Sequence, residues 1–134
     1  MVKDGVYNMT VIAITGFVGQ GKTVFLSYLA HKISSERKMP IYANYPLKDS
    51  KSVNDLCGNK GVILAIDEAN FSEMSYENQK ENILIVTAQD VKKLNLAESA
   101  MVVTVARKED KIISSLGDEI LLKEYLHLNL SDKK

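Results

Sequence analysis

Three glycines and a lysine–threonine pair fall within eight residues near the N-terminus, and this cluster constrains the fold more than any other feature. The segment GFVGQGKT, residues 16–23, has the spacing G-x4-G-K-T. Glycines let the backbone curl so that successive N–H groups point at an anion. In such a loop the lysine reaches the β- and γ-phosphates, and the threonine hydroxyl ligates Mg²⁺. We therefore predict a P-loop that binds nucleotide through Gly16, Phe17, Val18, Gly19, Gln20, Gly21, Lys22, Thr23 and Val24, with Lys22 also catalytic and Thr23 a metal ligand.

The flanking sequence supports this interpretation, because a P-loop joins a strand to a helix. An apolar, β-branched run from Met9 to Thr15 predicts a buried strand. After Thr23, apolar residues recur at three- and four-residue spacing, which predicts an amphipathic helix ending between Ser34 and Lys38, ahead of Pro40. The alternative is a glycine-rich turn with an incidental lysine.

The remaining chain alternates apolar strands with connections. We expect further strands at 40–47, 62–66, 83–87 and 100–107, and a short helix or turn within 51–61. Such a series predicts one α/β domain over residues 1–134 with a mainly parallel sheet covered on both faces. The tail, 119–130, is ambiguous, because its leucines alternate as in a strand while its first half also suits a helix.

Composition limits the classes of partner and the cellular compartments that suit this protein. Lys plus Arg and Asp plus Glu each number 17, so the net charge of zero gives no overall basic field that would indicate nucleic acid, although a local patch is compatible with neutrality. The single cysteine, Cys57, excludes an internal disulfide framework. Neither a signal-peptide core nor an apolar run of transmembrane length occurs in the sequence. We expect a cytoplasmic protein with no membrane span.

Two adjacent carboxylates, Asp67 and Glu68, follow the apolar run 62–66. Ligands of parallel α/β sheets bind at the carboxyl ends of strands, so Asp67 is expected to face the Mg²⁺ held by Thr23. Glu68 is then the candidate catalytic base that polarises the attacking water. The alternative for both residues is a pair of solvated loop acids.

A polar residue also follows the run 83–87, in the sequence Thr87-Ala88-Gln89. In P-loop ATPases that have an added strand between the P-loop strand and the Asp-Glu strand, a polar group here contacts the γ-phosphate or the attacking water. Gln89 can donate and accept hydrogen bonds, so we predict a catalytic role for it. The alternative is a polar residue at a helix N-terminus, beside a possible cap at Asp90.

Four segments in order, GFVGQGKT, YANYPL, ILAIDEAN and ILIVTAQ, resemble the FtsK–HerA division of P-loop ATPases. The likeness is closer to viral DNA-packaging ATPases and to zonula-occludens-toxin-like proteins of phages and archaeal mobile elements, and it includes Asn44 of the second segment. It implies a three-layer RecA-like fold of the ASCE type, with about five core strands and a C-terminal strand or hairpin. It further implies ATP and Mg²⁺ as ligands, a homo-oligomeric ring, double-stranded DNA as track, and a viral capsid or portal component as a possible partner.

The sequence departs from this family in its arginines. Such motors complete the site with an arginine from a neighbouring subunit, yet the chain has only Arg37 and Arg107. Arg107 is our candidate for a catalytic residue acting in trans, and a lysine is the alternative. A small-molecule kinase or an assembly ATPase acting on a protein remains the alternative function, and scarcity of arginine argues against the kinase.

Overall fold

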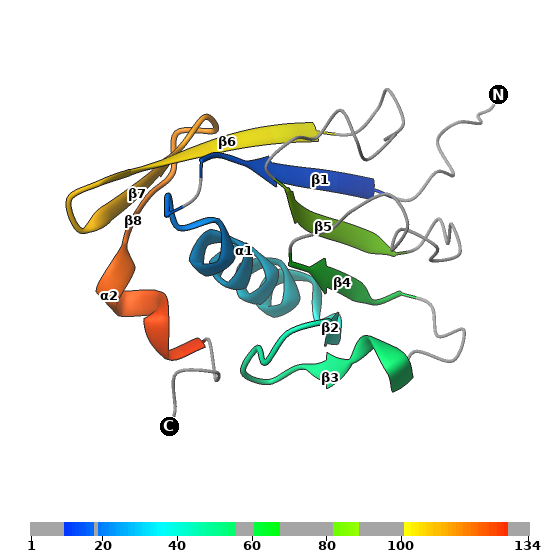
Figure 1. Ribbon diagram of the computed structural model, residues 1–134. Coiled ribbons are helices and arrows are strands. Elements are labelled where there is room, and N and C mark those ends of the chain that lie inside the picture. Colours follow the sequence, from blue (N-terminus) through cyan, green and yellow to red (C-terminus); the bar gives the residue numbers. More distant parts are fainter. Residues whose placement is uncertain (1–9, 18, 56–60, 68–81, 89–100, 129–134) are drawn as a thin grey trace, which may run out of the picture.

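The computed structural model describes residues 10–17, 19–55, 61–67, 82–88 and 101–128. Figure 1 shows how their elements are arranged. The strands and helices in chain order are β1 (Thr10–Thr15), α1 (Lys22–Arg37), β2 (Ile41–Ala43), β3 (Lys51–Ser52), a 3-10 turn (Val53–Asp55), β4 (Ile63–Ile66), β5 (Ile83–Ala88), β6 (Met101–Lys108), β7 (Lys111–Ser114), β8 (Glu119–Leu121), α2 (Leu122–Tyr125) and a second 3-10 turn (Leu126–Leu128).

All eight strands form one sheet in the order β3-β2-β4-β5-β1-β6-β7-β8. The pairings from β3 to β6 are parallel, whereas β6–β7 and β7–β8 are antiparallel. Strand β5 lies between β1 and β4, with Thr10 opposite Ile83 and Ile63 opposite Ile83 on the other side. The prediction of an α/β fold with a mainly parallel sheet is thus confirmed, and the antiparallel pair β7–β8 forms a hairpin at the C-terminal edge, where a strand or hairpin was expected.

Alternation along the central strands sends side chains to two separate cores. Strand β4 is buried at all four positions, with Ile63 and Ala65 on one face and Leu64 and Ile66 on the other. Continuous burial of this kind is typical of parallel strands that are covered on both sides. The same division runs through β1, β2 and β5, so each face of the sheet has its own apolar cluster.

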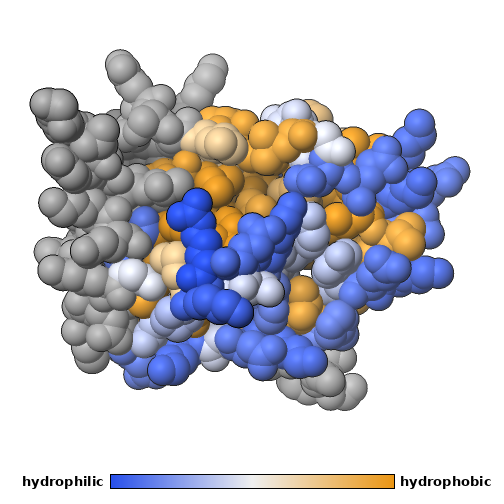
Figure 2. Space-filling model, turned by 180° about the vertical axis from the view of Figure 1, so that it is seen from behind, coloured by the Kyte–Doolittle hydropathy of each residue, from blue (hydrophilic) through white to orange (hydrophobic). Residues whose placement is uncertain are grey.

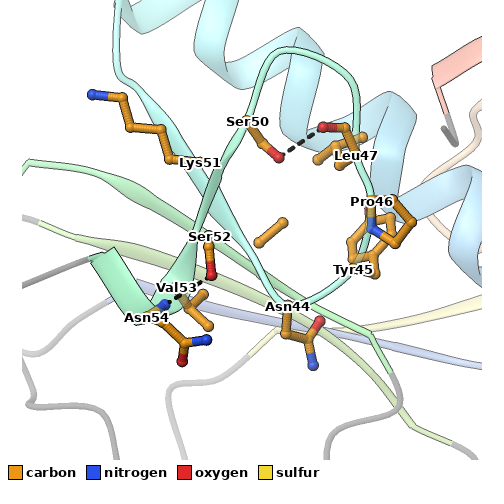
Figure 3. Close-up of a pocket in the computed structure, with 10 residues that line it drawn as sticks. Asn44, Tyr45, Pro46, Leu47, Ser50, Lys51, Ser52, Val53 and Asn54 are labelled. Atoms are coloured by element: carbon orange, nitrogen blue, oxygen red, sulfur yellow. Dashed lines mark hydrogen bonds between the residues drawn. The ribbon is translucent and has the colours of Figure 1, made fainter. Parts of the chain in front are cut away.

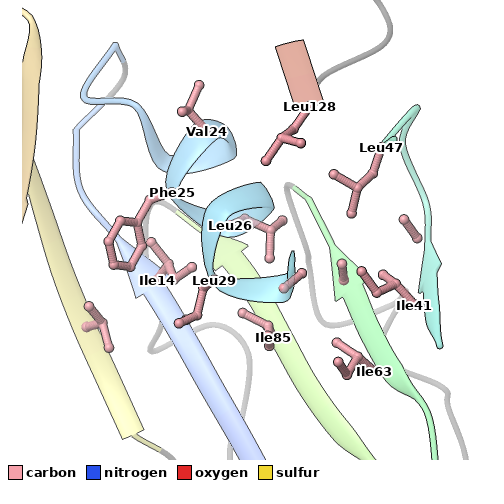
Figure 4. Close-up of a cluster of buried hydrophobic side chains, with 14 of the residues drawn as sticks. Ile14, Val24, Phe25, Leu26, Leu29, Ile41, Leu47, Ile63, Ile85 and Leu128 are labelled. Atoms are coloured by element: carbon pink, nitrogen blue, oxygen red, sulfur yellow. The ribbon is translucent and has the colours of Figure 1, made fainter. Parts of the chain in front are cut away.

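Helix α1 covers one of these faces. Its residues Phe25, Leu26 and Leu29 pack against Ile14 and Ile85 of the sheet (Figure 4). The helix ends where Lys38 adopts a left-handed conformation, φ 60°, and its N–H donates to Ser34 O at 2.8 Å. In the described part of the chain α1 is the one long helix, so the second helical layer of the expected three-layer fold is not seen there.

The C-terminal segment 119–128 is neither all strand nor all helix, the two alternatives that its sequence left open. Residues 119–121 form β8, and the chain then turns into α2 and a 3-10 turn. Of the alternating leucines, the two described, Leu126 and Leu128, lie in the 3-10 turn and not in a strand. Leu128 is buried in the core beside α1, and Tyr125 stacks edge-on against Tyr28 at 5.0 Å between centroids. A docked helical turn buries these side chains better than an outer strand would.

Two further expectations are corrected by the structure. The expected strand 40–47 is only three residues long, and β3 replaces the first part of the expected helix or turn at 51–61.

No helix of the described residues is long and apolar enough to cross a membrane. Figure 2 shows apolar side chains over the upper part of one side of the molecule, with hydrophilic side chains crossing its middle and lying along its right and lower edges.

Candidate nucleotide and metal site

The P-loop connects β1 to α1 and bends at its glycines. Gly19 and Gly21 have φ values of 84° and 87°, a region that L side chains rarely adopt. The turn closes with a hydrogen bond from Gln20 N to Phe17 O at 3.2 Å. The first intrahelical bond of α1 runs from Phe25 N to Gly21 O, so the helical N–H groups that precede Phe25 point out of the helix end toward the loop. Backbone donors and the helix dipole together favour an anion here.

Lys22 folds back over this loop. Its Nζ donates to Gly16 O at 2.7 Å and to Phe17 O at 3.2 Å. An ammonium group carries three donors. Among the described residues two carbonyls use two of them, which leaves the third for a phosphate oxygen. The positive charge therefore stands at the mouth of the loop.

Thr23 and Asp67 meet, although they are far apart in the sequence. Thr23 Oγ1 lies 3.0 Å from Asp67 Oδ1 and 3.1 Å from Oδ2. A hydroxyl has one proton and two lone pairs, so donation to the carboxylate leaves both lone pairs of Thr23 for a cation. Hydroxyl, carboxylate and water oxygens are the ligands that Mg²⁺ prefers.

Thr87 is a member of the site that the sequence did not single out. It is the fifth residue of β5, and its Oγ1 donates to Asp67 Oδ1 at 2.7 Å. One hydroxyl from the first turn of α1 and one from β5 thus donate to the same carboxylate. The signal was present in the sequence, since Thr87 opens the polar segment that follows the apolar run, but the role there was assigned to Gln89.

Within the described residues there is no group of three or more histidine, cysteine, aspartate or glutamate side chains that could hold a metal. A cage of protein ligands is therefore not the arrangement seen. One hydroxyl with one carboxylate suits Mg²⁺, which usually keeps several waters and takes the remaining ligands from substrate phosphates. The donor set thus fits the Mg²⁺ expected from the sequence.

The β6–β7 hairpin borders the P-loop on its other side. Gln20 Oε1 accepts a hydrogen bond from Arg107 N at 2.7 Å. A Cβ on Gly16 would lie 2.7 Å from Val105 O, and one on Gly21 would lie 2.5 Å from Ile112 Cδ1. Glycine is required at these two positions by close approach of the hairpin as well as by backbone conformation.

Arg107 lies beside the P-loop of its own chain. Its side chain is exposed, and Nε donates to Glu109 O at 2.9 Å within the hairpin turn. The structure thus describes a contact of this residue within one subunit, and its catalytic role in a neighbouring subunit stays a prediction.

The other predicted site residues divide into three groups. Val24 is buried in the core, so only its backbone could reach a nucleotide, whereas the ring of Phe17 is 85% exposed. Val18, Glu68 and Gln89 lie outside the described residues. Their predicted roles remain expectations.

A partly buried phenol, Tyr45, lies near the two candidate metal ligands. Burial raises the pKa of Tyr45 well above its usual range, and the negative charge of Asp67 raises it further. Tyr45 is therefore protonated at all physiological pH values and can act as a hydrogen-bond donor.

No protein-family model matches this sequence, and a search of curated proteins gives no significant match.

Proposed function

We propose that this chain is a Mg²⁺-dependent P-loop nucleoside triphosphatase with ATP as its nucleotide. The observation that carries the proposal is the contact of Thr23 Oγ1 with the Asp67 carboxylate at 3.0 and 3.1 Å, next to Lys22, whose Nζ donates to Gly16 O in the glycine-rich loop. A glycine-rich turn with an incidental lysine gives no reason for a distant carboxylate to meet the threonine of the motif.

Each residue has a distinct role in this proposal. The backbone N–H groups of the loop and Lys22 bind the phosphates, and Thr23 and Asp67 hold Mg²⁺, Asp67 through water. The bound ion supplies neutralisation of charge on the β- and γ-phosphate oxygens. Glu68, the residue after Asp67, orients or deprotonates the attacking water, and Gln89 contacts that water or the γ-phosphate.

The sheet order supports a more specific assignment. Strand β5 separates the P-loop strand β1 from the Asp67 strand β4, which is the added-strand arrangement that the resemblance implies. We accordingly propose a RecA-like ATPase of the ASCE type that acts as a motor on double-stranded DNA in a homo-oligomeric ring, as in viral genome packaging. This finer proposal depends on the resemblance and on the strand order, and the nucleotide proposal does not depend on it.

Nucleotide binding is tested with Lys22→Ala and a matched control, Lys123→Ala, which removes an exposed lysine of α2. Loss of a charge-assisted hydrogen bond costs about 1.5–3 kcal/mol, or about 10- to 150-fold in affinity. We expect Lys22→Ala to weaken MgATP binding by that factor in calorimetric titration and Lys123→Ala to leave it unchanged. Equal affinity in wild type and a folded Lys22→Ala protein would refute the P-loop assignment.

The motor is tested separately by measuring ATPase rate with and without double-stranded DNA at protein concentrations from nanomolar to tens of micromolar. A ring closing around DNA should raise specific activity with concentration and further with DNA. Activity that is flat in both respects would favour the small-molecule kinase or the assembly ATPase.

A further inference from the structure

Two consecutive residues after β2, Asn44 and Tyr45, contact the segments that carry the two candidate metal ligands. Neither is itself placed as a ligand of nucleotide or metal. Their contacts, described in turn below, point to a role in positioning Asp67 and Thr23.

Asn44 forms a reciprocal pair with the backbone of Asp67. Its Nδ2 donates to Asp67 O at 3.1 Å, and Asp67 N donates to its Oδ1 at 2.7 Å. Strand β4 ends at Ile66, so the side chain of Asn44 bonds the two backbone groups of the next residue in the way a neighbouring strand would. Because both backbone groups of Asp67 are held, the direction of its carboxylate is restricted.

Tyr45 acts on the other ligand through the fully buried Ser27. Ser27 Oγ donates to Thr23 O at 3.0 Å and lies 2.8 Å from Tyr45 Oη. Since a serine hydroxyl has one proton and Ser27 gives it to Thr23, Tyr45 must be the donor to Ser27. Through Ser27, the phenol therefore stabilises the first turn of α1, which carries Thr23.

The loop that carries both residues is itself anchored. Leu47 is 2% exposed and packs in the core under α1, and the next residue, Lys48, donates its N–H to Leu128 O at 2.8 Å. On its outer side the loop borders a cavity of about 550 Å³ whose opposite wall is formed by residues 50–54 (Figure 3). The loop that carries Asn44 and Tyr45 is therefore fixed to the core on one side and accessible from solvent on the other.

We propose that Asn44 and Tyr45 are positioning residues for the divalent-cation site of Thr23 and Asp67. This inference rests on the proposed function, because it presupposes that these two side chains hold Mg²⁺. Removal of a residue that hydrogen-bonds a metal ligand and orients it typically lowers metal affinity by about 10- to 100-fold.

The test measures metal affinity and metal-free nucleotide affinity in the same proteins. A fluorescent ATP analogue is titrated in EDTA and then at increasing Mg²⁺, and direct Mn²⁺ binding is followed by electron paramagnetic resonance. We expect Asn44→Ala to raise the Mg²⁺ concentration for half-maximal tightening by about 10-fold or more. Tyr45→Phe, which removes one hydroxyl, should raise it by about 3- to 10-fold. Affinity in EDTA, which depends on the loop and Lys22, should remain within about twofold of wild type for both.

Asn54→Ala is the matched control, because Asn54 is an exposed asparagine that lines the same cavity, and its bond to Ser52 Oγ uses the backbone N–H that the substitution keeps. Metal dependence equal to wild type in folded Asn44→Ala and Tyr45→Phe would overturn the inference. A parallel loss in EDTA and in Mg²⁺ would also overturn it, since it would indicate a purely structural role.

If Asn44→Ala does not fold, the more conservative Tyr45→Phe decides alone. Two outcomes separate the positioning inference from the proposed function on which it rests. If the wild-type protein itself shows no metal-dependent nucleotide binding, the proposed function fails and the inference fails with it. Normal wild-type dependence with unchanged variants refutes only the positioning role.

Discussion

Replacing Gly21 by alanine tests the packing of the P-loop against the β6–β7 hairpin. The substitution places a side chain at φ 87°, which costs about 1–2 kcal/mol in an L-residue. It also sets a Cβ 2.5 Å from Ile112 Cδ1 and 2.9 Å from Cγ1. Ile112 is fully buried and has little room to move, so this overpacking adds about 1–3 kcal/mol. The expected loss in free energy of unfolding is about 2–5 kcal/mol.

Gly19→Ala is the matched control, because Gly19 has nearly the same φ, 84°, but a Cβ there would meet nothing within 4 Å. It should cost only the backbone term, about 1–2 kcal/mol. Urea unfolding followed by far-UV circular dichroism measures both, since the chain has no tryptophan to report by fluorescence.

A double mutant isolates the contact itself. Ile112→Val removes the nearest carbon, Cδ1, and alone should cost about 0.5–1.5 kcal/mol. Combined with Gly21→Ala, it should relieve part of the clash, so that the pair is less destabilised than the sum by about 1 kcal/mol. Equal losses for Gly19→Ala and Gly21→Ala, together with strict additivity of Gly21→Ala and Ile112→Val, would refute the close approach of hairpin and P-loop.

Three further predictions concern the site and its surroundings. Glu68→Gln should keep MgATP affinity and slow phosphate release by about 10²- to 10⁴-fold, and normal turnover would make Glu68 a solvated loop acid. Gln20→Ala removes the acceptor of the Arg107 N–H, so the free energy of unfolding measured in urea should fall by about 0.5–1.5 kcal/mol. Gln20→Glu keeps an acceptor and should lose less stability. A larger loss for Gln20→Glu than for Gln20→Ala would contradict the hydrogen bond. Mixing Arg107→Ala with Glu68→Gln subunits should restore part of the ATPase activity if the arginine acts in trans, and a mixture as inactive as its components would exclude that role.

Local sequence signals were sufficient to place the glycine-rich loop and the strand and helix that flank it. The glycine spacing, the apolar run before it and the helical period after it placed β1 and α1 to within about two residues of the described bounds, a normal uncertainty for helix and strand ends. Asp67 could be paired with Thr23 because carboxyl ends of parallel strands share one edge of the sheet. The roles themselves remain predictions.

Long-range partners account for much of what was not predicted. The expected strand 40–47 stops after Ala43, because Asn44 turns to the Asp67 backbone and Tyr45 to Ser27. Neither partner is evident from the local pattern. Such partners override the strand propensity of the segment.

Strand β7 was missed for a different reason. It has four residues, and its connection to β6 is the two-residue turn Glu109-Asp110, with Glu109 at φ 58°. The usual sequence signal of a tight hairpin is Asn-Gly or Asp-Gly. A glutamate in a left-handed conformation leaves no such signal.

The position of β1 has a consequence for the order in which this protein can assemble. The P-loop strand is the first described strand to be synthesised, yet its two neighbours are β5, where Thr10 pairs with Ile83, and β6, where Ile12 pairs with Met101. Closing such long loops before any contact is gained makes folding slow and places these pairings late. On a ribosome, the segment 10–55 would leave the exit tunnel without either partner of β1. Under the proposed function, nucleotide would stabilise the native chain only after synthesis has passed β6. Until then β1 lacks both of its sheet partners and depends on other means of protection from aggregation.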